Sequence, residues 1–101
     1  MSNKRVYISG KISGLPVEQA KAKFGSYAQV LAGTGAVPVN PFDNGLPEDA
    51  SWQQHMRADI AMMMTCDEVH MLPCWIHSQG ATVEFQLAKQ LGMHIVLVEP
   101  K

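Results

Sequence analysis

One glutamate of this chain lies where its own helix is predicted to be apolar. Residues 79–92, QGATVEFQLAKQLG, have a helical pattern in which successive side chains advance by about 100°. Glu84 falls about 60° from Ala81, inside an arc of small and hydrophobic residues. That arc consists of Ala81, Phe85, Ala88, Leu91 and Gly92. Because an ordinary acid near a helix start faces solvent and interacts with the helix dipole, this inward position favours a functional role.

A second carboxylate, Asp59, repeats the anomaly on the helix predicted for residues 52–66. It lies about 20° from Trp52, at the centre of a stripe that faces the core. The other members of the stripe are Met56, Ile60 and Met63. Asp59 is either a structural acid, capping a loop or paired with Arg57 or Lys11, or a participant in chemistry. Two inward carboxylates are typical of glycosidic bond cleavage, where one attacks or stabilises the anomeric carbon and the other positions it or handles the leaving-group proton.

The loop after the first predicted strand, SGKISG at residues 9–14, is a candidate anion site. Its candidate ligand-binding residues are Gly10, Lys11, Ile12, Ser13 and Gly14. Backbone N–H groups, a lysine, a serine and the start of the following helix can together hold an anion. The segment matches neither a Walker loop nor GxGxxG, and a plain glycine-rich turn explains it about equally well.

Two hydroxyl groups also lie near the predicted strand ends. Ser78, close to Gly80 at the start of the helix that carries Glu84, is most simply the N-cap of that helix, although its hydroxyl can also contact a sugar or a phosphate. Tyr7 lies inside the first predicted strand. It is either an ordinary strand aromatic or a residue whose hydroxyl reaches the end of the sheet and orients an acid.

A metal site is not predicted. The spacing of Cys66, His70, Cys74 and His77 resembles a zinc ligand set, but it spans a helix end, a strand and a loop. An extended chain of that length places the two cysteines on the order of 25 Å apart, too far for one tetrahedral zinc. We therefore expect neither a metal nor another cofactor. The two tryptophans fit a core, an oligomer contact or a stacking wall for a base.

Composition limits the class of protein. The chain of 101 residues is 47% hydrophobic, enough for one domain over residues 1–101. A net charge of −1 does not indicate binding to a nucleic acid polymer or to a membrane surface. Two cysteines suit a reducing cytoplasm, and from the hydropathy pattern we expect neither a signal peptide nor a membrane-spanning run. A core this small favours a homo-oligomer, a dimer or higher.

Strand and helix patterns alternate along the chain. Strands are predicted at 5–9, 36–40, 67–73 and 93–100, and helices at 17–35, 52–66 and 79–92. This order predicts an α/β three-layer sandwich with a small, mainly parallel sheet of four to five strands. Ligands of such sheets bind beyond the carboxyl ends of the strands, which here means loops 10–15, 40–51 and 73–79.

Together these residues resemble the nucleoside 2-deoxyribosyltransferase-like superfamily over nearly the whole chain, and within it a short branch similar to the 2′-deoxynucleoside 5′-phosphate N-hydrolases. The segments that carry the resemblance are VYISGKISG, MRADIAMMMTCDEVHMLP and HSQGATVEFQLAKQLGMHIVLV. The last segment, with small residues followed by a glutamate and an alanine-rich helix, is the most specific.

The resemblance implies a flavodoxin-like fold and a role for each matching residue. Glu84 matches the nucleophile that forms a covalent glycosyl intermediate at the sugar C1′. Asp59 matches the acid that assists at the base or orients the nucleophile, and Tyr7 matches a tyrosine that hydrogen-bonds near the nucleophile. Residues 10–14 and Ser78, with Gly80 beside it, match the surroundings of the sugar and phosphate.

We therefore expect an enzyme that cleaves the N-glycosidic bond of a nucleoside or nucleoside 5′-monophosphate, by hydrolysis or deoxyribosyl transfer. Its partner would be a small-molecule nucleoside or nucleotide. The main alternative is a non-catalytic nucleotide-binding or sensing module of the same fold. A third alternative is a structural domain whose acids are simply buried.

Overall fold

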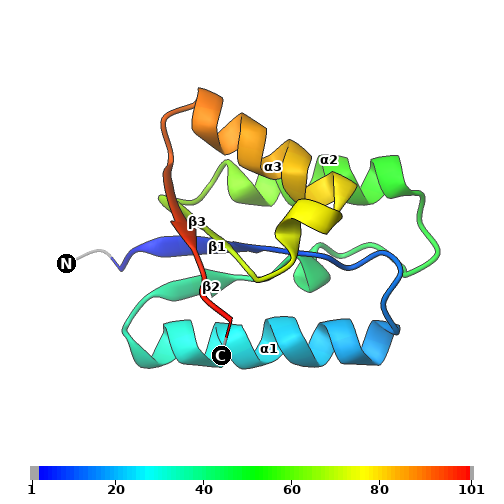
Figure 1. The fold of residues 1–101 in the computed structure, drawn as a ribbon, viewed down its shortest axis with the longest axis horizontal. Coiled ribbons are helices and arrows are strands. Elements are labelled where there is room, and N and C mark those ends of the chain that lie inside the picture. Colours follow the sequence, from blue (N-terminus) through cyan, green and yellow to red (C-terminus); the bar gives the residue numbers. More distant parts are fainter. Residues whose placement is uncertain (1–2, 101) are drawn as a thin grey trace.

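The computed structural model describes residues 3–100, which form an α/β domain with four strands and three α-helices (Figure 1). The strands are β1 (Arg5–Ser9), β2 (Val37–Val39), β3 (Glu68–Met71) and β4 (His94–Leu97). The helices are α1 (Val17–Gly33), α2 (Trp52–Met63) and α3 (Gln79–Gln90), with short 3-10 turns η1 (Pro41–Asp43) and η2 (Trp75–His77). Each predicted element is present, and most are two or three residues shorter than the sequence pattern suggested.

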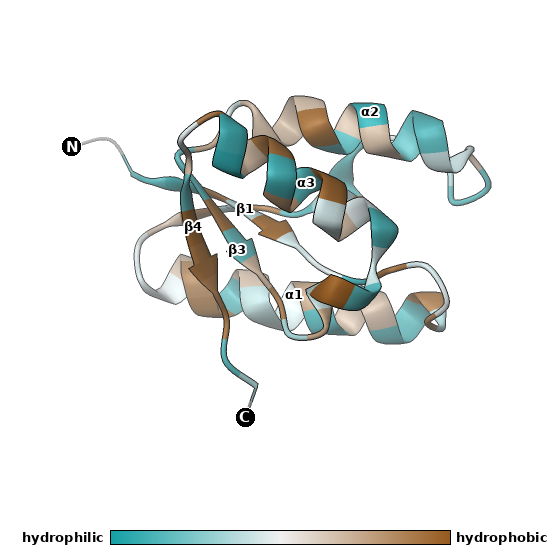
Figure 2. Ribbon diagram, turned by 45° about the horizontal axis from the view of Figure 1, so that its top comes forward, coloured by the Kyte–Doolittle hydropathy of each residue, from teal (hydrophilic) through white to brown (hydrophobic). Residues whose placement is uncertain are grey.

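The four strands form one all-parallel sheet in the order β2-β1-β3-β4. This arrangement is flavodoxin-like and confirms the predicted fold class. Pro38, which cannot donate a ladder hydrogen bond, lies in β2 at one edge of the sheet, a position where proline is tolerated. The hydrophobic strand β4, brown in Figure 2, forms the other edge.

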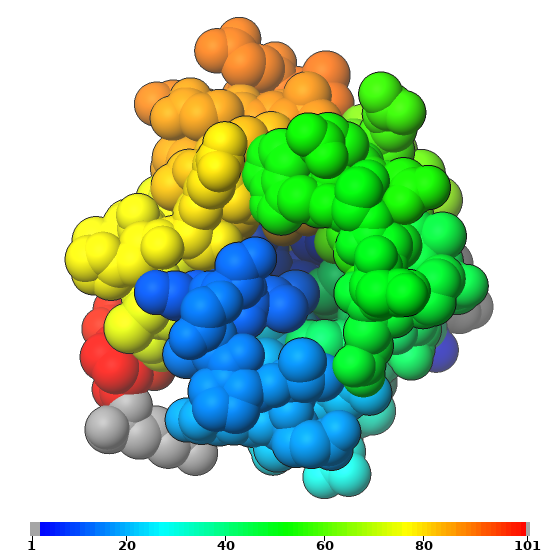
Figure 3. Space-filling view, turned by 90° about the vertical axis from the view of Figure 1, so that its right-hand side faces the viewer, coloured from blue at the N-terminus to red at the C-terminus, as the bar shows by residue number. Residues whose placement is uncertain are grey.

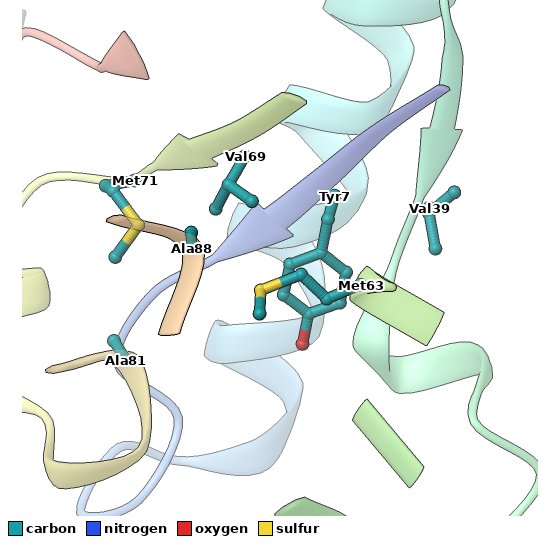
Figure 4. Packing of buried hydrophobic residues seen from close by; sticks show 7 residues of the cluster. All are labelled: Tyr7, Val39, Met63, Val69, Met71, Ala81 and Ala88. Atoms are coloured by element: carbon teal, nitrogen blue, oxygen red, sulfur yellow. The ribbon is translucent and has the colours of Figure 1, made fainter. Parts of the chain in front are cut away.

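The sheet is covered on both faces, with α1 on one side and α2 and α3 on the other (Figures 1 and 2). Neighbouring side chains of β1 point to opposite faces of the sheet, so this strand contributes to a hydrophobic core on each face. Val6 and Ile8 pack with Phe24 of α1. Tyr7 packs on the opposite face with Met63 of α2 and the small residues of α3, and Figure 4 shows its ring beside Met63.

Helices α2 and α3, which cover the same face of the sheet, begin at well-defined caps. The Ser51 hydroxyl accepts a hydrogen bond from the Gln54 amide at 3.1 Å, and the Gln54 side chain accepts one from the Ser51 amide, which completes a capping box at the start of α2. The Ser78 hydroxyl accepts from the Ala81 amide at 3.1 Å and caps α3. These caps fix the helix starts beside the carboxyl ends of β1 and β3.

One detail of the predicted apolar arc of α3 is wrong. Ala81, Glu84 and Ala88 are buried, but Leu91 is 56% exposed. The helix ends at Gln90, so Leu91 occupies the C-cap and leaves the helical face that the pattern extended through it. In the part of the chain that the structure describes, no helix has the length and hydrophobicity needed to cross a membrane.

Gly10, directly after β1, packs closely against the side chains of Leu72 and Phe24. A Cβ added there would lie 3.1 Å from the Leu72 Cβ and 3.2 Å from Phe24. Gly10→Ala should therefore lower the free energy of unfolding by about 1–3 kcal/mol through overpacking. Gly25→Ala, inside α1 with open space around it, should raise it by about 0.5–1 kcal/mol because alanine favours helix. Urea denaturation of both variants tests this contrast, and equal effects of one sign would contradict it.

Candidate active site

A cavity of about 370 Å³ opens at the carboxyl end of the sheet. Its walls come from the loop after β1, the segment from η1 to α2, and the start of α3. Figure 3 faces this end and shows a hollow between the blue loop, the green segment and the yellow start of α3. The volume lies within the range of small-molecule sites, roughly 300–1,000 Å³.

Eight of the ten candidate residues line this one cavity, although they come from distant parts of the chain. They are Tyr7, Gly10, Ile12, Ser13, Asp59, Ser78, Gly80 and Glu84. Lys11 and Gly14 are not among the lining residues. Lys11 lines a second hollow of about 340 Å³ on the α1 side of the loop, together with Lys23.

Glu84 is held by two hydroxyl groups of β1. The Tyr7 hydroxyl donates to Glu84 Oε2 at 2.7 Å, and the Ser9 hydroxyl donates to Oε1 at 2.6 Å. Tyr7 and Ser9 are two residues apart on one strand, so their side chains share a face of the sheet. Glu84 is only 4% exposed, yet it lines the cavity. The two bonds therefore fix the orientation of a buried carboxylate at the cavity wall.

Burial dominates the electrostatics of this glutamate. Loss of water raises the pKa of Glu84, and the nearby Asp59 charge adds to the rise, while the hydrogen bonds from Ser9 and Tyr7 oppose it. The net result is a pKa of about 7. Burial also raises the pKa of Tyr7, which keeps its hydroxyl a donor. Among residues 3–100, the ion pairs are Lys4–Glu68, Lys21–Glu48 and His70–Glu68, so no cation neutralises Glu84.

Asp59, on α2, is 7% exposed and also lines the cavity. Its partner is the Asn44 amide, which donates to Oδ1 at 2.8 Å, rather than Arg57 or Lys11. Burial raises the pKa of Asp59, and the Asn44 hydrogen bond and the nearby His55 oppose the rise. No hydrogen bond to Oδ2 occurs in the described residues, so that oxygen is free to meet a ligand.

Sequence reasoning missed three residues of this arrangement: Ser9, Asn44 and His55. Ser9 carried a usable signal, because it stands two residues after Tyr7 and so shares its face. His55 carried a similar one, four residues before Asp59 on the same helix. Asn44 lies in an irregular loop where no periodicity predicts the direction of a side chain.

The two tryptophans have different environments in the structure. Trp75 stacks on Phe85, with ring centroids 4.5 Å apart, and packs against the core. Trp52 is 39% exposed and lines the cavity together with Phe42 and Met56. Within residues 3–100, no three His, Cys, Asp or Glu side chains are placed to hold a metal ion. The cavity therefore combines an aromatic and thioether wall with two buried acids.

The family model described as "Domain of unknown function (DUF4406)" matches residues 4–97. The match covers nearly the whole chain, so the chain belongs to this family. Comparison with the curated proteins gave no match.

The raised pKa of Glu84 predicts a stability that falls as pH rises. The folded protein holds this proton up to about pH 7, whereas the unfolded chain loses it near 4.5. The native state is therefore weakened between these values, by about 3 kcal/mol. Glu84→Gln cannot ionise and should lack this loss, so urea denaturation at pH 5 and pH 8 should show a smaller fall for the variant than for the wild type.

The matched control is Glu18→Gln, which removes an exposed acid at the start of α1. Its stability should follow the wild-type pH dependence. Parallel curves for the wild type and Glu84→Gln would contradict the buried, destabilising carboxylate.

Proposed function

We propose that this member of the DUF4406 family cleaves the N-glycosidic bond of a nucleoside or nucleoside 5′-monophosphate. The sugar passes to water or to a second base through a covalent glycosyl ester on Glu84. The observation that carries this proposal is a buried, unneutralised carboxylate, fixed by two hydroxyl donors at the wall of a cavity that holds a second buried acid.

A purely structural role fits Glu84 poorly. Burying a carboxylate is costly, and structural cases are normally offset by a cationic partner. Here the partners are neutral hydroxyls, and the carboxylate keeps a pKa near 7, so a substantial fraction is ionised at neutral pH. A partly desolvated, oriented carboxylate has the properties of a nucleophile, because little water must leave it before it attacks.

In the first step, a Glu84 oxygen attacks the sugar C1′ and forms an ester bond. The C1′–N bond breaks, and its electron pair goes to the base nitrogen. Asp59, whose pKa is raised by burial, supplies a proton to the departing base from its protonated form.

In the second step, a water molecule or a second base attacks C1′ from the face that the first base vacated. The ester C1′–O bond breaks, and its electron pair returns to the Glu84 carboxylate. Asp59, now ionised, accepts the proton of the attacking group. The enzyme thus returns to its starting protonation, and the sugar has undergone two displacements.

The remaining walls suit the two halves of such a substrate. Trp52, Phe42 and Met56 offer an apolar surface for a flat base. Ser13 and the backbone of the loop after β1 lie on the same cavity and are available to the sugar or to a 5′-phosphate. Lys21 also lines the cavity, but it is paired with Glu48 at 3.0 Å.

Release of free base tests the proposal. The protein is incubated with a panel of nucleosides and their 5′-monophosphates, and free base is followed by chromatography. Glu84→Gln should lower the rate on the accepted substrate by on the order of 10³-fold or more, because it removes the nucleophile but keeps the shape. Glu18→Gln, with its exposed acid outside the cavity, should retain the wild-type rate.

Two outcomes would contradict the proposal. One is wild-type turnover that survives in Glu84→Gln. The other is binding of nucleotides without release of base from any of them, which would favour the non-catalytic binding or sensing module.

A further inference from the structure

His55 lies on α2 one turn before Asp59 and lines the same cavity. Trp52 stands three residues before it and Asp59 four residues after it, so the three side chains share one face of the helix. This wall offers an aromatic surface, an imidazole and an acid in sequence along the helix. The proposed reaction assigns tasks to the first and the third but none to the imidazole.

Asn44 fixes which nitrogen of His55 carries the proton. The Asn44 Oδ1 accepts a hydrogen bond from the Leu46 amide at 2.9 Å, which sets the orientation of the side-chain amide. Its Nδ2 therefore faces both Asp59 Oδ1, at 2.8 Å, and His55 Nδ1, at 3.0 Å. Because Nδ2 carries two hydrogens and no lone pair to offer, His55 Nδ1 must be the acceptor.

The neutral imidazole then carries its hydrogen on Nε2. This atom has no hydrogen-bond partner among residues 3–100, and the side chain is half-buried at the cavity wall. The network from Leu46 to Asn44 thus holds a preset donor beside the acid. The same amide orients both groups, since it contacts Asp59 and His55 at once.

The geometry points to His55 as the residue that recognises and stabilises the departing base. Its Nε2–H donates a hydrogen bond to an acceptor beside the glycosidic nitrogen, such as purine N3 or pyrimidine O2. When the C1′–N bond breaks, its electron pair spreads onto this acceptor and the hydrogen bond strengthens. His55 keeps its hydrogen, and Asp59 supplies the proton. The inference rests on the proposed function and identifies the base as the part of the substrate that α2 contacts.

Two substrates with different leaving groups test this role. One is the nucleoside that the wild type accepts, and the other is the p-nitrophenyl glycoside of the same sugar. The p-nitrophenolate leaves as a stable anion and offers no acceptor beside the bond that breaks. His55→Ala should lower the rate on the nucleoside by about 100-fold and change the rate on the p-nitrophenyl glycoside little. His94→Gln, which changes an exposed residue of β4, is the control and should change neither rate.

Two further variants test the position of the donor. His55→Gln places an amide N–H near the place of Nε2 and should recover much of the nucleoside rate. His55→Asn places its amide near Nδ1 and should not. Recovery by asparagine alone, or equal losses on both substrates in His55→Ala, would overturn the assignment. A wild type that cleaves neither substrate would overturn the proposed function itself. Cleavage of both substrates with unchanged rates in His55→Ala would overturn only the role of His55.

Discussion

The buried carboxylate of Glu84 needs a hydrogen-bond donor at each oxygen, and β1 supplies both. Tyr7 and Ser9 meet this need because a strand places residues two apart on one face. The rest of the arrangement follows from that constraint. The Ser78 cap starts α3 beside the end of the sheet, and the small residues Ala81 and Ala88 let the helix pack closely onto it. The cavity that the loops leave open gives access to Glu84.

Asp59, on the other side of the cavity, is also held by a hydrogen bond from a neutral group. Asp59 is buried on α2 and depends on one amide, Asn44, whose own orientation depends on the backbone of Leu46. Both acids accept hydrogen bonds from neutral groups, and burial keeps the pKa of each raised. Burial of two acids lowers the stability of the fold, and packing in the two hydrophobic cores must offset that cost. This balance connects the packing of a small domain to the chemistry proposed for it.

Periodicity in the sequence was enough to predict the burial of Glu84 and Asp59, because each lies on a helix whose apolar arc is clear. It was also enough for the element order and the parallel sheet. The partners of the two acids were harder, since Ser9 and Glu84 are 75 residues apart and Asn44 lies in an irregular loop. Local pattern likewise does not tell to which side of a loop Lys11 turns. These features depend on how the helices pack on the sheet, which a short stretch of sequence does not determine.

In the proposed reaction, Glu84 forms a covalent bond with the sugar. The most direct measurement is the intact mass of the protein after incubation with a 2-deoxy-2-fluoro nucleoside, whose fluorine slows breakdown of a glycosyl ester. The mass should increase by one fluorinated sugar, located by peptide mapping on Glu84 in α3, and this increase should be absent from Glu84→Gln. Turnover of the natural nucleoside with no adduct on the wild type, or an adduct on a different residue, would contradict the proposed reaction.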